Sequence, residues 1–153
     1  MKQKPVVWID SREKNNQHIT DCFADKKIDY FVSKLPFGDY MSLDNARLIC
    51  ERKSGLLEIV STIGTEHERF KKELKDATRY GIHIIILIEE EGFFCLEDVK
   101  SWVNPFSKKN PRAMTGETVY KILSAYTQYY DIEIQFTCKG DAAQKILELL
   151  KAA

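Results

Sequence analysis

Residues 38–53 read GDYMSLDNARLICERK. Within this stretch two strand-like runs, Asp39–Leu43 and Arg47–Lys53, flank a turn-forming Asp-Asn pair. The pattern is typical of a β-hairpin. A hairpin brings residues of two strands side by side on one face of a sheet, so its register decides which side chains meet.

The register of this hairpin depends on the length of its turn. A two-residue turn would place Asp39 opposite Cys50, on the wrong face to meet Glu51. A three-residue loop gives three facing pairs: Leu43 with Arg47, Met41 with Ile49, and Asp39 with Glu51. The last pair would then have its Cβ atoms about 5 Å apart. Two facing carboxylates repel unless a cation lies between them, and we predict the three-residue register.

The carboxyl end of the hairpin carries a set of residues suited to phosphodiester hydrolysis. Glu51 and Lys53 share a face because residues two apart on a strand do, whereas Arg52 points the other way. Mg²⁺ typically takes one or two carboxylates and completes its octahedron with water and substrate phosphate. Such a metal lowers the pKa of a bound water, and Lys53 would orient that water and stabilise the transition state. The alternative is a simple Gly-Asp turn beside a solvated Glu-Lys pair.

Strands and helices alternate along the rest of the chain, which indicates an α/β sandwich around a mixed β-sheet. Further strands are predicted at Val6–Asp10, Tyr30–Lys34, Ile82–Ile88 and Ile132–Phe136. Helices are predicted at 16–26, 65–79, 115–130 and from Asp141 onward. The strand at Ile82–Ile88 should be central and covered on both faces. The helix at 65–79 should open with a capping box at Thr65–Glu68, and Asn104–Arg112 should be a loop.

Composition bounds the class of protein. The chain has 153 residues, of which 44% are hydrophobic and 30% charged, as expected for one globular domain. The 23 basic residues balance 23 acidic ones, so a nucleic-acid contact must come from a local patch. No apolar run approaches the roughly 18 residues of a membrane helix. With no secretory leader and with four widely spaced cysteines, an intracellular protein of the cytoplasm, nucleoid or nucleus is expected.

The Gly38-Asp39 and Glu51-Arg52-Lys53 motifs resemble the GDxnERKx3D signature of the XPF-type structure-specific endonucleases, a branch of the PD-(D/E)XK nuclease superfamily. The run that ends in Asp10-Ser11-Arg12-Glu13 is similar to that family's first strand, and the resemblance covers about Val6 to Glu89. It implies a restriction-endonuclease-like sandwich, a mixed central sheet flanked by helices. It also implies a Mg²⁺-dependent endonuclease, with Mn²⁺ as a substitute, that cuts branched, flap or junction DNA in repair or recombination.

The resemblance also implies a role for each matching residue. The catalytic group would comprise Asp10, Glu13, Asp39, Glu51, Arg52 and Lys53. Asp39 and Glu51 would bind the metal, with the Arg52 backbone carbonyl as a candidate third ligand, and Lys53 would be the catalytic lysine. Arg12 would contact DNA or order the acidic cluster. Both arginines could instead form structural salt bridges.

The chain departs from the signature at its last acidic position, which is Leu57. Glu58 follows, but one helical step rotates a side chain by about 100°. We therefore expect Glu58 to replace the missing acid only if the local helix starts later. This departure keeps open a second function, that of a catalytically weak or inactive nuclease-fold subunit that binds DNA or an active partner.

Basic side chains outside these motifs are candidates for phosphate contacts, which position DNA without reading its sequence. On the helix at 65–79 they are Arg69, Lys71, Lys72, Lys75 and Arg79, and on the following loop they are Lys108, Lys109 and Arg112. A solvated helix face and a loop without a ligand are the alternatives.

A single nuclease domain spanning residues 1–153 is expected, without the helix-hairpin-helix domain that commonly follows one in this family. DNA affinity would then come from the nuclease domain, from self-association or from another protein. The resemblance implies a homodimer or heterodimer. A candidate surface is the helix face of Val119, Leu123, Tyr126 and Tyr130, and the alternative is that this face packs on its own sheet.

Overall fold

The computed structural model describes residues 4–151 and contains one six-stranded mixed sheet in the order β2-β1-β3-β4-β5-β6. The strands are β1 (Val6–Asp10), β2 (Asp29–Ser33), β3 (Tyr40–Ser42), β4 (Asn45–Lys53), β5 (His83–Glu89) and β6 (Ile132–Thr137). Strand β3 is antiparallel to both its neighbours, and all other pairs are parallel. The prediction that the chain has no secretory leader depends partly on residues 1–3, which lie outside the described residues.

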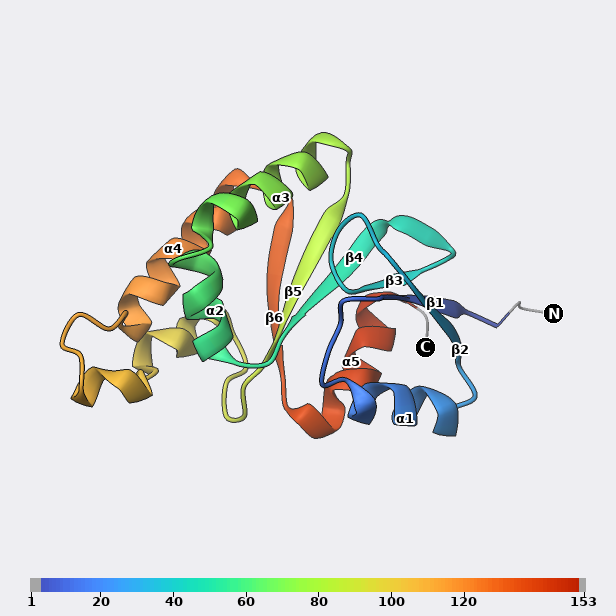
Figure 1. Ribbon diagram of the computed structural model, residues 1–153, viewed down its shortest axis with the longest axis horizontal. Helices are drawn as coiled ribbons and strands as arrows, with labels where there is room; N and C mark the ends of the chain where they lie inside the picture. The colour runs from blue at the N-terminus through green and yellow to red at the C-terminus, as the bar shows by residue number, and fades with distance from the viewer. Residues whose placement is uncertain (1–3, 152–153) are drawn as a thin grey trace.

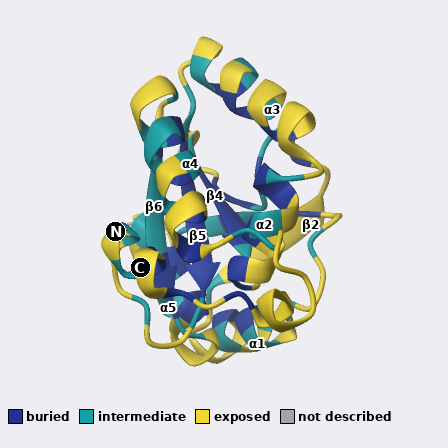
Figure 2. Ribbon diagram, turned by 90° about the vertical axis from the view of Figure 1, so that its left-hand side faces the viewer, coloured by how far each residue is buried: buried dark blue, intermediate teal, exposed yellow. Residues whose placement is uncertain are grey.

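Helices cover both faces of the sheet (Figures 1 and 2). One layer holds α1 (Gln17–Asp25) and α5 (Ala142–Leu149), and the other holds α2 (Leu56–Ile63), α3 (His67–Arg79) and α4 (Gly116–Tyr129). Short 3₁₀ segments occur at η1 (Leu96–Ser101), η2 (Pro105–Lys108) and η3 (Lys139–Asp141). The arrangement confirms the predicted α/β sandwich around a mixed sheet. None of the helices within residues 4–151 is long and apolar enough to span a bilayer.

Strand β5 is buried on both faces because apolar side chains alternate between the two helix layers. Ile84, Ile86 and Ile88 pack with α2, α3 and α4, whereas Leu87 packs with α1 and α5. All four side chains are fully buried. This confirms the prediction of a central strand covered on both faces.

Helix α4 begins where its sequence predicts, with the Thr115 side chain accepting a hydrogen bond from the Thr118 amide. The side chains of Val119, Leu123 and Tyr126 are buried against the sheet. Of the two interpretations of this face, packing on its own sheet is therefore the one that the structure shows for these three residues.

The predicted start of the helix at 65–79 is wrong. Thr65 does not open a helix, because its hydroxyl donates to the Ser61 carbonyl and α3 begins only at His67 without a side-chain cap. For helix α2 the sequence analysis gives no bounds, because its eight residues span too few turns for a periodic pattern to stand out. In the segment predicted as a loop, η2 adds one 3₁₀ turn from Pro105.

The hairpin register is confirmed at the end that matters for the site, where Met41 pairs with Ile49. The predicted pairing of Leu43 with Arg47 is wrong, because Ser42 pairs with Asn45 and the register shifts between Met41 and Ser42. The Ser42 hydroxyl accepts from the Asp44 amide and the Asn45 side chain from the Arg47 amide. These local bonds favour a tighter turn, and the irregular pairing in β4 absorbs the difference.

Candidate active site

Gly38 allows the loop before β3 to approach β4 closely. Its φ of +65° lies in the left-handed region, and a Cβ there would overlap the Ile49 side chain. The next residue, Asp39, is anchored twice to β4. Its amide donates to the Cys50 carbonyl at 2.9 Å, and its Oδ2 accepts from the Arg52 amide at 2.8 Å.

A cleft of about 770 Å³ opens between this loop, the carboxyl ends of β1 and β4, and helix α3. It is lined by all six residues of the predicted catalytic group: Asp10, Glu13, Asp39, Glu51, Arg52 and Lys53. Among the predicted DNA contacts, Arg12, Arg69 and Lys72 also line it, whereas Lys75, Lys108 and Lys109 do not. The two carboxylates of the hairpin therefore face one cavity.

Glu51 is a buried acid without a full set of partners. Its side chain is almost entirely enclosed, and its Oε2 accepts no hydrogen bond from any residue in the described range 4–151. Burial, followed by the negative charge of Glu73, raises the pKa of Glu51 well above its ordinary value. A buried acceptor without a donor is costly, so Glu51 is suited to receive a cation or a donor from a ligand.

Asp39 experiences a similar environment. Burial raises the pKa of Asp39 to about 7, and the Glu13 carboxylate adds to the shift, although the Arg52 amide opposes it. Asp39, which is half-buried, and Glu51, which is buried, thus share one cleft in which two negative charges are unfavourable. A divalent cation between them would offset both the burial and the repulsion.

Lys53 lies beside these acids without being tightly bound to them. Its Nζ is 3.9 Å from Glu51 Oε1 and 3.9 Å from Glu58 Oε1, both beyond ordinary hydrogen-bond length. The ammonium also lies 5.6 Å from the centre of the Phe70 ring. The side chain is thus positioned by charge and packing, while its donors stay available to a ligand in the cleft.

The donor set fits a Mg²⁺ ion of the kind that keeps part of its hydration shell. Across residues 4–151, no three His, Cys, Asp or Glu side chains converge into a group that could hold a metal. Mg²⁺ does not need such a group, since it commonly binds through one or two carboxylates and takes water and substrate phosphate as its other ligands. The unpartnered Oε2 of Glu51 is the observation that supports the fit.

Arg52 lies on the opposite face of β4 and belongs to a buried ion cluster. Its guanidinium donates to both Glu13 carboxylate oxygens at 2.8 and 3.1 Å, to Glu89 at 3.0 Å and to the Lys14 carbonyl at 2.7 Å. The His18 ring lies 3.0 Å from the same Glu89. Arg52 was considered either as a member of the catalytic group or as part of a structural salt bridge, and the structure shows the salt bridges to Glu13 and Glu89.

Asp10 and Arg12 hold the loop that enters the site. Asp10 accepts from the Leu35 amide at 2.8 Å and from Arg12 Nε at 2.9 Å, and Arg12 also donates to the Leu35 carbonyl. Burial alone would raise the pKa of Asp10, but the bonds from Arg12 and Leu35 outweigh it and leave the pKa lowered. The Arg12 side chain is 62% exposed, so it also presents positive charge to the cleft.

Glu58, and not Leu57, reaches the cleft. Helix α2 begins at Leu56. The later helix start, which was our condition for Glu58 to replace the missing acid, is therefore not observed. Glu58 nevertheless turns back toward the helix start, where its Oε2 accepts from the Ser54 amide at 2.6 Å and the Ser54 hydroxyl at 2.7 Å. Leu57 is an exposed side chain.

Sequence reasoning missed two acids near the site. Glu73 of α3 accepts from the Gly38 amide at 3.3 Å and lines the cleft. Glu89 ends β5 and pairs with Arg52 and His18. The signal for Glu89 was available, since a charged residue ends an otherwise apolar central strand. No comparable signal marks Glu73, which lies on a helix rich in charged residues.

The family model of the ERCC4 domain matches residues 9–150. The chain belongs to the ERCC4 domain family. The match includes both hairpin acids, Lys53 and every helix of the sandwich.

Solved structures show the same fold. XPF from Aeropyrum pernix has a TM-score of 0.69 and 19% identity over 96% of this chain. XPF from Aeropyrum pernix in complex with DNA matches with the same TM-score and identity over 97% of this chain. Each match covers 64% of the longer XPF chain. No curated protein matches the chain. The XPF-type resemblance and the restriction-endonuclease-like fold are thus confirmed.

Proposed function

We propose that this ERCC4-family chain is a divalent-metal-dependent endonuclease that hydrolyses phosphodiester bonds of branched, flap or junction DNA in repair or recombination. The observation that carries the proposal is the pair of carboxylates Asp39 and Glu51 in the cleft: Glu51 Oε2 has no hydrogen-bond partner among the described residues, and Lys53 lies beside it. Family membership supports nuclease chemistry. The likeness to an XPF structure solved with DNA supports DNA as the substrate.

Each residue of the cleft has a defined task in this proposal. Asp39 and Glu51 would hold Mg²⁺, or Mn²⁺ in its place, with Asp39 fixed by the Arg52 amide. The bound ion would supply neutralisation of negative charge on the scissile phosphate and a more acidic water. Lys53 would donate from Nζ to the attacking water or to a phosphate oxygen, where charge develops in the transition state.

Basic side chains around the cleft would hold the DNA backbone. Arg69 and Lys72 are 84% and 77% exposed, and within the described part of the chain they form ion pairs only with Glu66, the residue before α3, and with Asp76 of α3. Such surface pairs contribute little stability, so phosphates can replace them readily. Lys75, Lys108 and Lys109 lie outside the cleft and would extend the contact along the backbone.

The test is a panel of labelled flap, fork, junction and linear DNAs incubated with Mg²⁺ or Mn²⁺. Cleavage of a branched substrate by the wild-type chain should be lost in Glu51→Gln and Lys53→Ala and kept in Lys139→Ala, an exposed lysine outside the cleft. Cleavage that survives both site substitutions, or that needs no divalent cation, would contradict the proposal.

A second function, that of a weak or inactive subunit, is favoured by Leu57 at the position of the signature's last acid. Such a subunit would bind DNA or pair with an active chain. A calorimetric Mn²⁺ titration separates the two functions, since a degenerate site should bind no metal.

Within the proposal, the protein acts inside the cell and forms a dimer with its own copy or a related chain. Light scattering measures the oligomeric state.

A further inference from the structure

One half of the sheet lacks a helix layer on the face that carries the cleft, within the described part of the chain. A single row of paired residues crosses the sheet on this face: Phe31, Trp8, Met41, Ile49, Ile84 and Ile132. At Ile84 and Ile132, helices α2, α3 and α4 cover the row. At the β2 end, Phe31 is 39% exposed. Figure 1 shows these three helices gathered over β5 and β6, away from β1 and β2.

Four aromatic rings occupy the uncovered half, and we refer to Trp8, Phe31, Phe37 and Tyr80 as the aromatic surface. The Trp8 and Phe31 rings pack with centroids 5.4 Å apart, and the Phe37 and Tyr80 rings with centroids 6.4 Å apart. A buried apolar floor that includes Met41 supports Trp8 and Phe37. Trp8 is further fixed because its indole N–H donates to the Ser33 carbonyl at 3.0 Å.

The aromatic surface adjoins the cleft. Phe37 lines the cleft and lies two residues before Asp39. Tyr80 packs on Phe37 from the end of α3 and is 68% exposed. A chain of nucleotides that leaves Asp39 and Glu51 on this side therefore meets the Phe37 and Tyr80 rings first, with Trp8 and Phe31 beyond the apolar floor.

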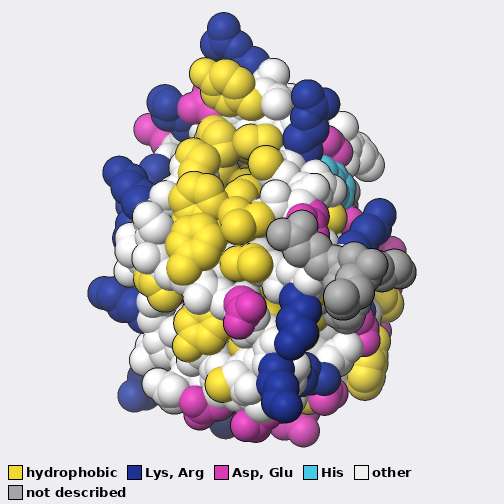
Figure 3. All heavy atoms as spheres, turned by 90° about the vertical axis from the view of Figure 1, so that its right-hand side faces the viewer, with side chains coloured by type: hydrophobic (Ala, Val, Ile, Leu, Met, Phe, Trp, Pro, Cys, Tyr) yellow, Lys and Arg dark blue, Asp and Glu magenta, His cyan; other side chains and the backbone are white. Residues whose placement is uncertain are grey.

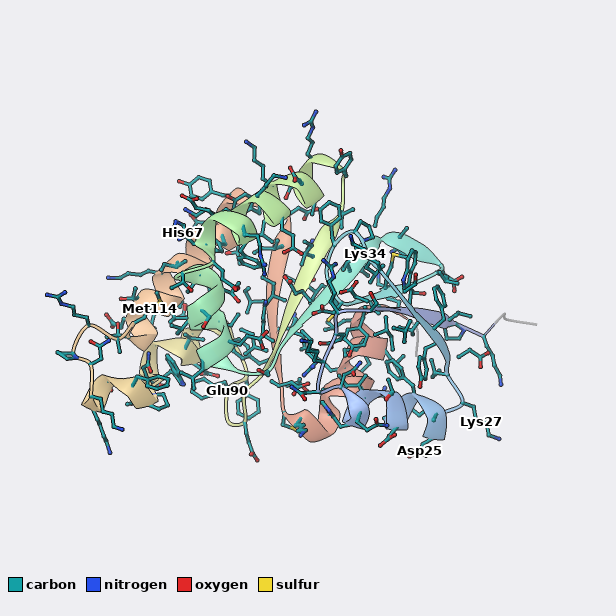
Figure 4. All side chains as sticks on the ribbon, in the orientation of Figure 1. Asp25, Lys27, Lys34, His67, Glu90 and Met114 are labelled. Carbon is teal, nitrogen blue, oxygen red and sulfur yellow. The ribbon has the colours of Figure 1, made fainter. Side chains whose placement is uncertain are left out.

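Basic side chains border the aromatic surface. Figure 3 shows a continuous hydrophobic area on this side of the molecule, with Lys and Arg side chains along both margins. Lys34 and Arg79 are both exposed and are close in sequence to Phe37 and Tyr80. In Figure 4, Lys34 lies on the side of the sheet opposite to α1. Aromatic rings beside positively charged side chains are typical of surfaces that bind single-stranded nucleic acid.

We propose that the aromatic surface binds an unpaired strand of the DNA substrate, with bases stacked on its rings and phosphates paired with Lys34 and Arg79. Only an unpaired strand fits, because bases inside a duplex are already stacked on one another. The inference rests on the proposed function for the identity of the polymer that leaves the cleft. It assigns substrate selection to a surface outside the metal site.

Tryptophan emission provides a test that needs no catalysis. The chain has two tryptophans, so Trp102→Phe leaves Trp8 as the only tryptophan, whose emission is excited selectively at wavelengths that tyrosine does not absorb. In EDTA, oligothymidylate should quench Trp8 emission, and a blunt duplex of equal length should not. Trp102 is nearly buried, so thermal melting should first show that this variant folds.

Binding of labelled oligothymidylate, measured by anisotropy in EDTA on otherwise wild-type protein, gives the second test. Tyr80→Ala should weaken binding by roughly 5- to 150-fold, the range for loss of one stacked base, and should change duplex binding by less than about 2-fold. Tyr129→Ala is the matched control, since Tyr129 is 79% exposed on α4. Lys34→Gln should reduce the salt dependence of binding more than Lys139→Gln does.

Equal effects of Tyr80→Ala and Tyr129→Ala would overturn the inference, as would unchanged Trp8 emission on saturation with oligothymidylate. Concentration-dependent self-association that Phe31→Asp abolishes, without any quenching, would assign the surface to a second copy of the chain and also overturn it. Cleavage without these binding effects would leave the proposed function intact. Binding with these effects but no cleavage would support the aromatic surface and remove the proposed function.

Discussion

The two faces of β4 at its carboxyl end each bury one charged side chain, Arg52 on one face and Glu51 on the other, and the two differ in how fully they are hydrogen-bonded. On one face Arg52 makes hydrogen bonds of 2.7 to 3.1 Å with three partners. On the other, unsatisfied face Glu51 keeps an oxygen that has no hydrogen-bond partner among residues 4–151, and Lys53 Nζ lies 3.9 Å from Glu51 Oε1. Burial therefore does not distinguish a structural charge from a functional one. In the proposed function the difference lies in hydrogen bonding, because the incompletely hydrogen-bonded side chain, Glu51, is the one that lies beside Asp39 in the cleft.

The largest expected effect is on the unsatisfied face. Glu51→Gln should lower the rate of DNA cleavage by about 1,000-fold or more, because the charge that attracts the metal is lost. The free energy of unfolding in EDTA should stay equal or rise, since the substitution removes a buried charge that lacks a full set of partners. Single-turnover cleavage and urea denaturation measure the two quantities. If Glu51→Gln strongly lowered the free energy of unfolding and left cleavage unchanged, Glu51 would be a structural residue and not a metal ligand.

The satisfied face should show the opposite behaviour. Arg52→Met removes the partner of Glu13 and Glu89 and should lower the free energy of unfolding by about 3–5 kcal/mol, the usual cost of breaking a buried ion pair. Arg47→Met, an exposed arginine on the same strand, is the control and should change it by less than about 0.5 kcal/mol. Equal denaturation midpoints for the two variants would show that the cluster around Arg52 contributes nothing.

The pH dependence of stability tests the unsatisfied face without DNA. The pKa of Asp39 is raised from 3.8 to about 7 in the folded protein, so the folded state binds more protons than the unfolded state between these values. The free energy of unfolding in EDTA should therefore fall from pH 5 to pH 8, by about 1 kcal/mol or more from this group.

Two comparisons isolate the contribution of Asp39. Asp39→Asn should flatten this part of the pH profile, and Mg²⁺ should restore stability at pH 8 by binding only the folded state. Parallel pH profiles of Asp39→Asn and wild type between pH 5 and pH 8 would show that Asp39 does not titrate with a raised pKa.

The smallest effect concerns the departure from the signature. Glu58→Ala should slow cleavage by about 10-fold, because Glu58 holds Ser54 and flanks Lys53. Leu57→Ala should change the rate by less than about 2-fold, since Leu57 is exposed and does not line the cleft. Steady-state cleavage of the best branched substrate measures both. A larger loss of cleavage rate in Leu57→Ala than in Glu58→Ala would show that position 57, and not Glu58, supports catalysis.

The strands could be predicted because their information is local. The apolar run of β5 and the alternation of Glu51, Arg52 and Lys53 follow directly from strand geometry. The hairpin turn could not be predicted, because side-chain bonds of Ser42 and Asn45 select a tighter turn than the facing acids suggest. The pairing of Met41 with Ile49 was nevertheless predicted correctly, because it follows from opposing the two acids at the other end of the hairpin.

The environment of the site depends on contacts that only the fold provides. Arg52 finds Glu13 and Glu89 at separations of 39 and 37 residues. Glu73 reaches Gly38 from a helix whose exposed residues are nearly all charged, so nothing in its own sequence context separates it from its neighbours. Motif spacing thus identified the acids and the lysine. Which of their polar atoms lack a hydrogen-bond partner could be read only from the structure.

Binding of Mn²⁺ to the protein without DNA tests the central claim most directly. Calorimetric titration at pH 8 should show one or more Mn²⁺ ions bound by the wild-type chain, with binding weakened at least about 10-fold in Glu51→Gln and unchanged in Glu91→Gln, an exposed glutamate outside the cleft. Equal Mn²⁺ affinity in all three proteins, or no binding by the wild-type chain, would contradict the claim that the unsatisfied face of β4 is a metal site.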